Sequence, residues 1–382
     1  MASPVAIDVV DLRRRSDRRR FLDVAAPIYR DHPCYVEPLR GERLKFLDPD
    51  VNPGLANLEI QAWIARRDGR DVGRITAHVD RLYDGLHGTG TGWFGFFESI
   101  DDPAVAHALL AAAVRRHAAR GATEMIGPMS FTTNQECGLL VENFTRRPTF
   151  GTSYNPPYYE ALLTSFGCRG VKDLYGWWMD VTTGFEEPGR ARIAAFAERL
   201  KARADVVIRH AERRRYRDEW ALMFDIYQEA WRDNWGYSPI TREEFGWTAE
   251  SARPILREEL ALIVEVHGQP VGFAISLPDA NEIAPRNGRL FPFGWVRFAF
   301  GLRHIRHARL ILLGIRPAYR KRGLESLLCI ETALRARQIG LGGGEVSWTL
   351  EDNVLINRAI EAMGGRRDRT WRLYRMPLAA SV

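Results

Sequence analysis

Hydrophobic and polar residues alternate along two stretches of the chain, and a glycine interrupts each stretch near its middle. The first stretch is "WIARRDGRDVGRITAHVD" at 63–80, and the second is "LIVEVHGQPVGFAISLPD" at 262–279. Alternation with a period of two is typical of strands that bury one face, and a glycine between two such runs favours a tight turn. Each stretch therefore predicts a β-hairpin.

The two stretches also match each other position by position. The matching positions are Ile64, Gly69, Val72, Gly73 and Asp80 in the first and Ile263, Gly268, Val271, Gly272 and Asp279 in the second. Further along, "LLAAAVRRHAARGATEMIGPMSFTTN" at 109–134 resembles "LCIETALRARQIGLGGGEVSWTLEDN" at 328–353. Two matches in the same order indicate an internal duplication. The second copy has gained about 20 residues between the two matches. Chance similarity of short glycine-containing hairpins is the alternative.

The rest of the pattern gives both halves a similar order of elements. In the first half we expect a helix at 19–31, the hairpin, a strand at 92–99, a helix at 103–120, a strand at 124–130 and a terminal hairpin at 168–182. In the second half we expect strands at 205–211, 309–315, 345–350 and 370–376 beside the hairpin, and helices at 215–234, 249–260, 324–339 and 354–363. This mixture predicts an α+β fold with mixed sheets flanked by helices. We expect two lobes, 1–182 and 190–382, joined by a linker, "TTGFEEPGR" at 182–190.

Composition narrows the class of protein. The 382 residues are 46% hydrophobic, yet no apolar run approaches the roughly 20 residues that a bilayer-spanning helix needs. The N-terminal stretch "MASPVAIDVVDLRRRSDRRR" lacks the apolar core of a signal peptide. The four cysteines are scattered without a C-x-x-C pair, which argues against disulfides and a zinc site. We therefore expect a cytoplasmic protein without a metal.

One segment, 286–309, carries six arginines, two histidines, five aromatic residues and no acid, against a net charge of +6 for the whole chain. It overlaps the residues gained in the second half. Written as a helix from 295, it has one apolar stripe, made of Trp295, Phe298, Ala299, Leu302 and Ile305. A basic helix with aromatic residues on its other face is typical of a membrane-interfacial helix.

Two interpretations of this segment remain open, a surface that contacts an anionic membrane and an ordinary amphipathic helix packed on the sheet. The first would place the protein peripherally on the inner face of the cytoplasmic membrane. Phe291, Trp295 and Phe298 are the candidate lipid-contacting residues. No helix-turn-helix, zinc-finger or aromatic-platform motif accompanies the basic residues, so the sequence does not favour nucleic acid as a partner.

The stretch "GIRPAYRKRGLESLL" at 314–328 follows a hydrophobic strand and leads into a helix. Its basic residues stand just before Gly323, and a helix N-terminus favours a bound anion. Glu325 stands where a phosphate-binding turn usually has a second small residue. A carboxylate at about 5 Å from one phosphate charge would cost roughly 3 kcal/mol at an effective dielectric constant near 20. Glu325 is thus a surface residue that suits the helix dipole, a residue that abolishes binding, or a catalytic group.

The order of elements in the second half resembles that of the GNAT (Gcn5-related N-acetyltransferase) superfamily. That order is a hairpin, a strand, a basic Gly turn, a helix, a strand and an "N…G" helix. Arg320-x-x-Gly323-x-Glu325 meets two positions of the Q/R-x-x-G-x-G/A pattern and departs at the third. "GWFGFFESIDD", "GPMSFTTNQECGLLVENF", "SYNPPYYEALLTSFGC" and "DLYGWW" resemble two-lobed bacterial members of this superfamily, a group that includes bacterial ceramide synthase.

The resemblance implies a tandem, pseudo-symmetric acyl-CoA N-acyltransferase fold with acyl-CoA as co-substrate. The residues that would hold the cofactor lie in the second lobe, because "ESIDDPAVAH" in the first lobe has no basic Gly turn. They are Arg320, Lys321, Arg322, Gly323 and Leu324 at the pyrophosphate and Leu313, Gly314 and Ile315 at the thioester. A β-bulge near Leu313 to Ile315 would offer a backbone N–H to the thioester carbonyl.

The catalytic residues are less clear, because the family's usual tyrosine, seven residues after the Asn of the last motif, is Ile360 here. Candidates to replace it are Glu351, Asn353 and Tyr319, with Asp352, His304 and His307 as alternatives. Asn134, Tyr154 and Tyr158 are candidates to line an acceptor pocket between the lobes, or else they only seal the lobe interface. Glu98 stands at a strand end, where a lone acid is usually solvated.

By resemblance, the expected function is transfer of a long acyl chain from acyl-CoA to the amine of a sphingoid base. Two rival hypotheses are an acetyltransferase that acts on a small polar amine, and a non-catalytic protein of the same fold that binds lipid or a partner protein. The departures at Glu325 and Ile360 favour the last of these.

Overall fold

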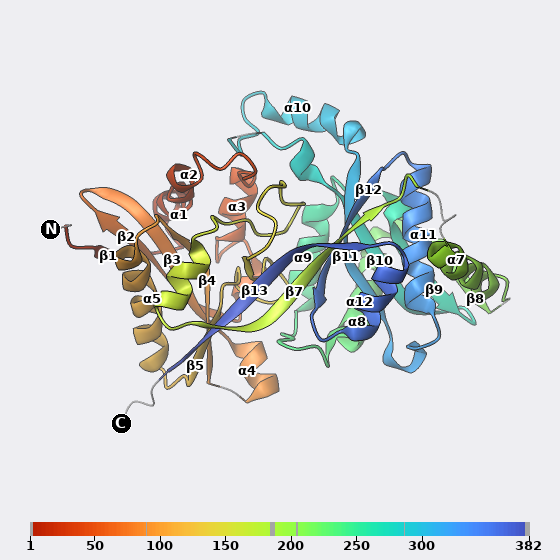
Figure 1. The fold of residues 1–382 in the computed structure, drawn as a ribbon, viewed down its shortest axis with the longest axis horizontal. Helices are drawn as coiled ribbons and strands as arrows, with labels where there is room; N and C mark the ends of the chain where they lie inside the picture. The colour runs from red at the N-terminus through yellow and green to blue at the C-terminus, as the bar shows by residue number, and fades with distance from the viewer. Residues whose placement is uncertain (1–2, 89, 184–187, 204, 286, 379–382) are drawn as a thin grey trace.

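The computed structural model describes residues 3–88, 90–183, 188–203, 205–285 and 287–378. Within them, thirteen strands form one sheet in the order β1-β2-β3-β4-β5-β13-β7-β12-β11-β10-β9-β8, with β6 paired to β13 (Figure 1). The first half contains β1 (Ala6–Val10), α1 (Arg15–Asp23), α2 (Ala25–Ile28), α3 (Arg40–Phe46), β2 (Leu58–Arg67), β3 (Arg70–Asp80), α4 (Arg81–His87), β4 (Thr91–Ser99), α5 (Pro103–Ala118), β5 (Glu124–Gly127), β6 (Leu139–Leu140), α6 (Tyr159–Ser165) and β7 (Arg169–Asp180). The second half contains α7 (Pro188–Lys201), β8 (Val206–His210), α8 (Tyr216–Trp231), α9 (Arg242–Ala252), β9 (Ala261–Val266), β10 (Gln269–Pro278), α10 (Gly294–Gly301), β11 (His307–Ile315), α11 (Leu324–Gln338), β12 (Gly343–Leu350), α12 (Val354–Ala362) and β13 (Arg366–Pro377).

Both predicted hairpins are confirmed, and their turns have the same backbone geometry. Asp68 and Gly69 join β2 to β3 with φ angles of 50° and 74°, and His267 and Gly268 join β9 to β10 with φ angles of 52° and 73°. Positive φ at both central residues is the signature of the two-residue turn that matches the twist of a hairpin. The α+β class and the mixed sheet flanked by helices are also confirmed.

The last strands of the two halves are exchanged. β13 comes from the end of the second half, yet it lies between β5 of the first half and β7. Conversely, β7 from the first half pairs with β12 of the second. Figure 1 shows the two strands crossing the centre of the molecule, and the chain ends beside the first half.

The predicted terminal hairpin at 168–182 is wrong, because β7 is one continuous strand of 12 residues. The division into lobes 1–182 and 190–382 stays a prediction. It follows the order of the chain, whereas in space each half includes a strand from the other. The proposed linker at 182–190 falls partly on residues 184–187, outside the described residues.

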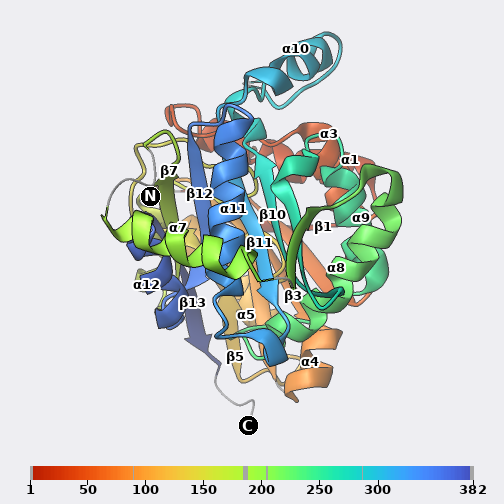
Figure 2. The same cartoon turned by 90° about the vertical axis from the view of Figure 1, so that its right-hand side faces the viewer.

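Helices cover both faces of the second half of the sheet. α8 and α9 pack on one face through Met223, Phe224 and Phe245, which contact Ile263 and Phe273 of the hairpin. α7 and α11 pack on the other face, where Ala197 and Leu327 join Leu262 and Val264 (Figure 2). The sequence pattern missed α7 and predicted a helix at 249–260 where α9 ends at Ala252.

Glu244 of α9 lies buried against the first half and provides a test of this interface. Burial and the neighbouring Asp80 raise the pKa of Glu244 from 4.5 to about 7, and Gln135 donates a hydrogen bond to its carboxyl group. The unfolded chain therefore loses this proton near pH 4.5 while the folded chain holds it to about pH 7. The free energy of unfolding should fall by roughly 3–4 kcal/mol as pH rises through that window.

We predict that Glu244→Gln flattens this decline and raises the Tm at pH 8, as measured by calorimetry from pH 5 to 8. The control is Glu243→Gln, which changes an exposed neighbour on the same helix. Parallel Tm curves for the wild type and Glu244→Gln would contradict the prediction.

Candidate functional site

The candidate site begins where the parallel pairing of β11 and β12 ends. The two strands pair over only four positions, from His307 opposite Gly343 to Leu310 opposite Val346. Beyond that point no ladder pair joins the half-buried residues Ile311–Leu313 to β12. Unpaired backbone N–H and C=O groups along two diverging strands can hydrogen-bond an extended ligand.

A β-bulge lies at the same point. Ile275 pairs with Leu312 and Ser276 with Leu310, so Ile311 is the extra residue. The prediction of a bulge near Leu313 to Ile315 was therefore wrong by about two residues. A Cβ on Gly314 would lie 2.2 Å from the ring of Trp231, so close contact with α8 keeps this part of the strand regular.

The corresponding place in the first half is filled. β4 and β5 are also parallel over a short stretch, from Thr91 opposite Glu124 to Trp93 opposite Ile126. There the backbone N–H of Met129 donates to the carbonyl of Phe94 at 2.9 Å. A Cβ on Gly95 would lie 1.7 Å from the carbonyl oxygen of Met129, so no room remains between these segments. The two halves differ at equivalent positions, and unpaired strand backbone follows the parallel pairing in the second half.

The basic turn directly follows β11. Lys321 and Gly323 adopt left-handed backbone angles, with φ of 62° and 82°, and α11 begins at Leu324. Arg320 is not available to a ligand, because it donates to the carbonyl groups of Ala230 and Ile315 and braces the turn against α8. Lys321 and Arg322 are exposed and form no ion pair within the described part of the chain. They are the cations that remain for an anion.

Glu325 lies in the first turn of α11, where its charge suits the helix dipole. It forms no ion pair with the cations of the turn in the described residues. Phe196 of α7 packs beside Gly323, because a Cβ on this glycine would lie 2.3 Å from its ring. The turn therefore requires glycine at 323 for both conformation and space.

The catalytic candidates from the sequence lie in two places. Glu351 and Asp352 follow β12 and both approach Lys172, at 3.8 Å and 2.8 Å, with Asn353 next to them at the start of α12. Tyr319 instead lies in the turn after β11, beneath the guanidinium of Arg322.

The alternatives are placed elsewhere. His304 is exposed and His307 is bound to Glu282 at 2.7 Å. Ile360, at the position of the missing tyrosine, is 2% exposed in the hydrophobic core, so no polar group stands there.

A buried polar network at the end of the strand pairing was missed from the sequence. Ser347 donates to Glu345 at 2.6 Å, and the Nε of Arg309 donates to Ser347 at 2.9 Å. Glu345 is 2% exposed, and Arg369 of β13 lies 3.7 Å from it. Burial lowers the pKa of both guanidinium groups, although the carboxylate opposes this effect.

Charged residues inside the hydrophobic strand patterns at 307–315 and 343–350 could have revealed this buried polar network. Buried charges require partners, so such residues indicate that partners lie nearby.

A loop of the first half covers this network. The carbonyl of Phe150 accepts a hydrogen bond from Arg309, and the carbonyl of Arg147 accepts one from Arg369. Asp279 accepts from the backbone N–H of Phe150 at 2.9 Å. The first half therefore forms the wall of the site on the face of the sheet away from α11.

The three predicted acceptor residues each hydrogen-bond a different part of the protein. Asn134 bridges the halves, since it donates to the carbonyl of Ser238 and accepts from Tyr227. Tyr154 donates to the carbonyl of Phe144, while Tyr158 donates to that of Ser99 within the first half.

Glu98 is not solvated as expected. Its side chain is only 12% exposed, accepts hydrogen bonds from Tyr29 and Tyr159, and pairs with Arg74. Burial raises the pKa of its carboxyl group.

The predicted apolar stripe at 295–305 divides into two parts. α10 ends at Gly301, and Phe298 and Leu302 pack against the body of the protein. Trp295 points outward, together with exposed Phe291. Ile305 lies beyond the helix and is buried.

Comparisons with known proteins place the chain among characterised families. It is 35% identical over 369 residues to protein YghO of Escherichia coli K12, which covers 94% of this chain and 93% of that protein. It is 32% identical over 380 residues to bacterial ceramide synthase of Caulobacter vibrioides, covering 97% of this chain and 98% of that protein. No family model matches the sequence.

Solved structures show the same fold at low identity. A tandem GNAT protein from the clavulanic acid biosynthesis pathway aligns with a TM-score of 0.60 at 12% identity, over 99% of this chain and all of that one. A GCN5-related N-acetyltransferase from Sphaerobacter thermophilus aligns with a TM-score of 0.54 at 13% identity, over 99% and 97%. The chain therefore has the tandem GNAT fold and belongs to the bacterial family that includes protein YghO and bacterial ceramide synthase.

Proposed function

We propose that this protein transfers a long acyl chain from acyl-CoA to the amine of a lipid-like acceptor, a sphingoid base. The observation that carries the proposal is the end of the β11–β12 pairing, followed after β11 by a turn with two exposed cations, Lys321 and Arg322, that form no ion pair in the described residues. The same place in the first half is filled by backbone. The 32% identity to bacterial ceramide synthase over nearly the whole chain supports the sphingoid acceptor.

In this mechanism Lys321, Arg322 and the first N–H groups of α11 hold the pyrophosphate. The backbone beside the bulge at Ile311 hydrogen-bonds the thioester carbonyl and stabilises the oxyanion that develops there. The neutral amine attacks the carbonyl carbon, a C–N bond forms, and the C–S bond breaks. The thiolate leaves with the electron pair, and a thiol of ordinary pKa near 8.5 needs little assistance to leave.

The proton of the amine leaves through Ser347 to Glu345, which already share a hydrogen bond of 2.6 Å. This route removes the proton of the amine. It does not take over the role of the family's tyrosine, a proton donor to the leaving thiolate, because the thiolate here leaves without a donor at the position of Ile360. Glu351 remains the rival proton acceptor, because it lies at the end of the same strand beside Lys172.

The exposed surface around α10 is the second part of the proposal. Phe291, Phe293, Trp295 and Phe300 are between 58% and 85% exposed, and α10 projects from the body in Figure 2. The arginines at 289, 297, 303 and 306 are exposed and form no ion pair with any described residue. Exposed aromatic rings among unpaired cations suit the surface of an anionic bilayer. No described helix is long and apolar enough to cross a membrane.

Thermal unfolding with acyl-CoA tests the cofactor turn. At a hundredfold excess over its Kd, palmitoyl-CoA should add about 2.7 kcal/mol to the free energy of unfolding. Arg322→Ser should weaken binding at least fivefold, because it removes a charge-assisted hydrogen bond to phosphate. Arg337→Ser removes an exposed charge from the other end of α11 and should have no effect.

The rival functions give different results in the same measurement. Stabilisation by acetyl-CoA that exceeds that of palmitoyl-CoA would favour a small polar acceptor. No shift with CoA, acetyl-CoA or palmitoyl-CoA would favour a non-catalytic binding protein.

Steady-state kinetics test the proton route. Glu345→Gln should lower kcat at least tenfold while the thermal shift with palmitoyl-CoA persists, since this side chain lies away from the turn. General bases typically contribute 10²–10⁴-fold to a rate. Glu351→Gln is the matched comparison. A loss that falls on Glu351→Gln instead would assign the proton to the strand-end acid.

Vesicle sedimentation tests the membrane surface. We expect binding to phosphatidylglycerol vesicles that weakens with salt, and little binding to phosphatidylcholine. Phe293→Ser with Trp295→Ser should reduce binding at least tenfold, because burying each ring contributes about 1.5–3 kcal/mol. The control combines Val9→Ser with Val207→Ser, two exposed apolar residues on strands far from α10 in sequence. Equal losses in both double variants would contradict a specific surface.

A further inference from the structure

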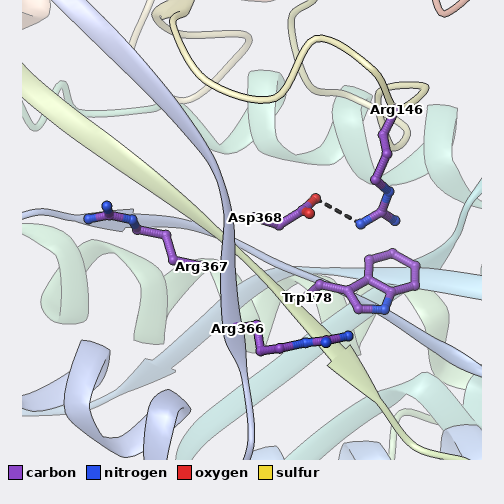
Figure 3. A pocket seen from close by; sticks show the side chains of 5 residues that line it. All are labelled: Arg146, Trp178, Arg366, Arg367 and Asp368. Atoms are coloured by element: carbon purple, nitrogen blue, oxygen red, sulfur yellow. Dashed lines mark hydrogen bonds and ion pairs between the residues drawn. The ribbon is translucent and has the colours of Figure 1, made fainter.

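A cavity of about 530 Å³ lies where β7 and β13 cross and is lined by Arg146, Trp178, Arg366, Arg367 and Asp368. Figure 3 shows Arg146 reaching down from the covering loop to Asp368, with Trp178 beside it and Arg366 beneath the indole. Arg367 points away from the other four toward the opposite side of β13. Nothing in the acyl-transfer mechanism uses this cavity.

Its side chains are held in place by contacts on several sides. Arg146 forms an ion pair with Asp368 at 2.8 Å and lies over the ring of Trp178 at 3.9 Å. Asn143 donates to the same carboxylate at 2.9 Å. The ring of His307 lies 5.0 Å from that of Trp178. The wall of this cavity is therefore organised before any ligand arrives.

The charges around the cavity do not balance. Asp368 is paired with Arg146, whereas Arg366 is exposed and forms no ion pair within the described part of the chain. Behind the wall, Arg369 is 1% exposed, and its Nε and Nη1 have no hydrogen-bond acceptor. That Nε lies 3.9 Å from the carboxylate of Asp368. In the lining itself, Arg146 and Arg366 face one carboxylate, that of Asp368, and this excess of positive charge favours an anion.

We propose that this cavity binds the phosphate group of an organic phosphate. Guanidinium groups stay charged and bind phosphate oxygens in pairs, so Arg366 and Arg146 provide the recognition. The cavity is much larger than a phosphate ion, and Trp178 offers an apolar face for the organic part. The proposal goes beyond the transfer reaction and does not depend on it.

The site is distinct from the acyl-CoA turn. Trp178 of β7 pairs with Arg366 of β13 on one side and with Glu345 of β12 on the other. Glu345 lies in the part of β12 that still pairs with β11. The basic turn lies after the other end of β11. The cavity is close to the residues that follow α10. The ring of His307 lies 5.0 Å from that of Trp178, and Glu282 accepts hydrogen bonds from the backbone N–H groups of both Arg306 and His307. A lipid phosphate from that surface and a soluble organic phosphate are therefore both reasonable sources.

Isothermal titration calorimetry on the full chain at constant ionic strength tests the proposal. The probes are glycerol 3-phosphate, inorganic phosphate, and dihexanoyl phosphatidic acid below its micelle concentration. Arg366→Gln should weaken the binding of at least one phosphate probe tenfold or more, and Arg146→Gln should do the same. Arg337→Gln, which removes one exposed charge elsewhere, should leave it unchanged. Arg366 forms no ion pair with a described residue, so Arg366→Gln should fold normally. It therefore tests the proposal even if Arg146→Gln, which loses the ion pair with Asp368, fails to fold.

Binding of phosphatidic acid alone would support the site and name a lipid head group as the source. Binding of glycerol 3-phosphate as well would support the site and name a soluble phosphate. Absence of heat with all three probes would overturn the proposal, and so would equal weakening by Arg337→Gln. The thermal shift with palmitoyl-CoA should be the same in Arg366→Gln as in the wild type, which separates this site from the cofactor turn.

Discussion

The hydrogen bonding of β7 on both edges is the constraint on which the rest of the structure depends. Its backbone groups pair with β12 along one edge and with β13 along the other, and both partners come from the second half of the chain. Without them β7 would present two unpaired edges, and buried backbone N–H and C=O groups are costly to leave without partners. The first half in turn receives β13 beside β5. Neither half completes its own sheet, so their folding is coupled.

This exchange also explains how a charged network survives in the interior. Removing one partner of a buried ion pair typically costs 3–5 kcal/mol, because the remaining charge is uncompensated. Arg309 and Glu345 are opposite each other on the paired strands β11 and β12, whereas Arg369 of β13 comes near them only because β7 and β13 continue the sheet. The loop from the first half then supplies carbonyl groups to both arginines. The network and the exchange therefore stabilise the same arrangement.

Local sequence signals predicted the parts of the fold that local chemistry decides. The hairpins followed from Gly69 and Gly268, because a two-residue turn with positive φ needs such residues wherever it occurs. The basic turn at Arg320 to Gly323 was recognisable because its residues are contiguous. The same signals could not identify which strand pairs with which, since a period of two marks a buried face and says nothing about the neighbour. Arg320 contacts α8, whereas Arg322 is exposed and hydrogen-bonds its own turn, and this difference also depends on a tertiary contact.

The two halves differ at the place where their parallel strand pairing ends, and the backbone contacts at that place explain the difference. In the second half the parallel strands separate after Leu310 and Val346, and a bulge at Ile311 leaves backbone groups available. In the first half Met129 closes the equivalent place with a backbone hydrogen bond to Phe94. The loop around Phe150 of the first half contacts the second half, where its carbonyl accepts a hydrogen bond from Arg309. In this tandem fold the first half, whose own strand gap is filled by Met129, therefore forms one wall of the site in the second half. A single lobe has no second half to form such a wall.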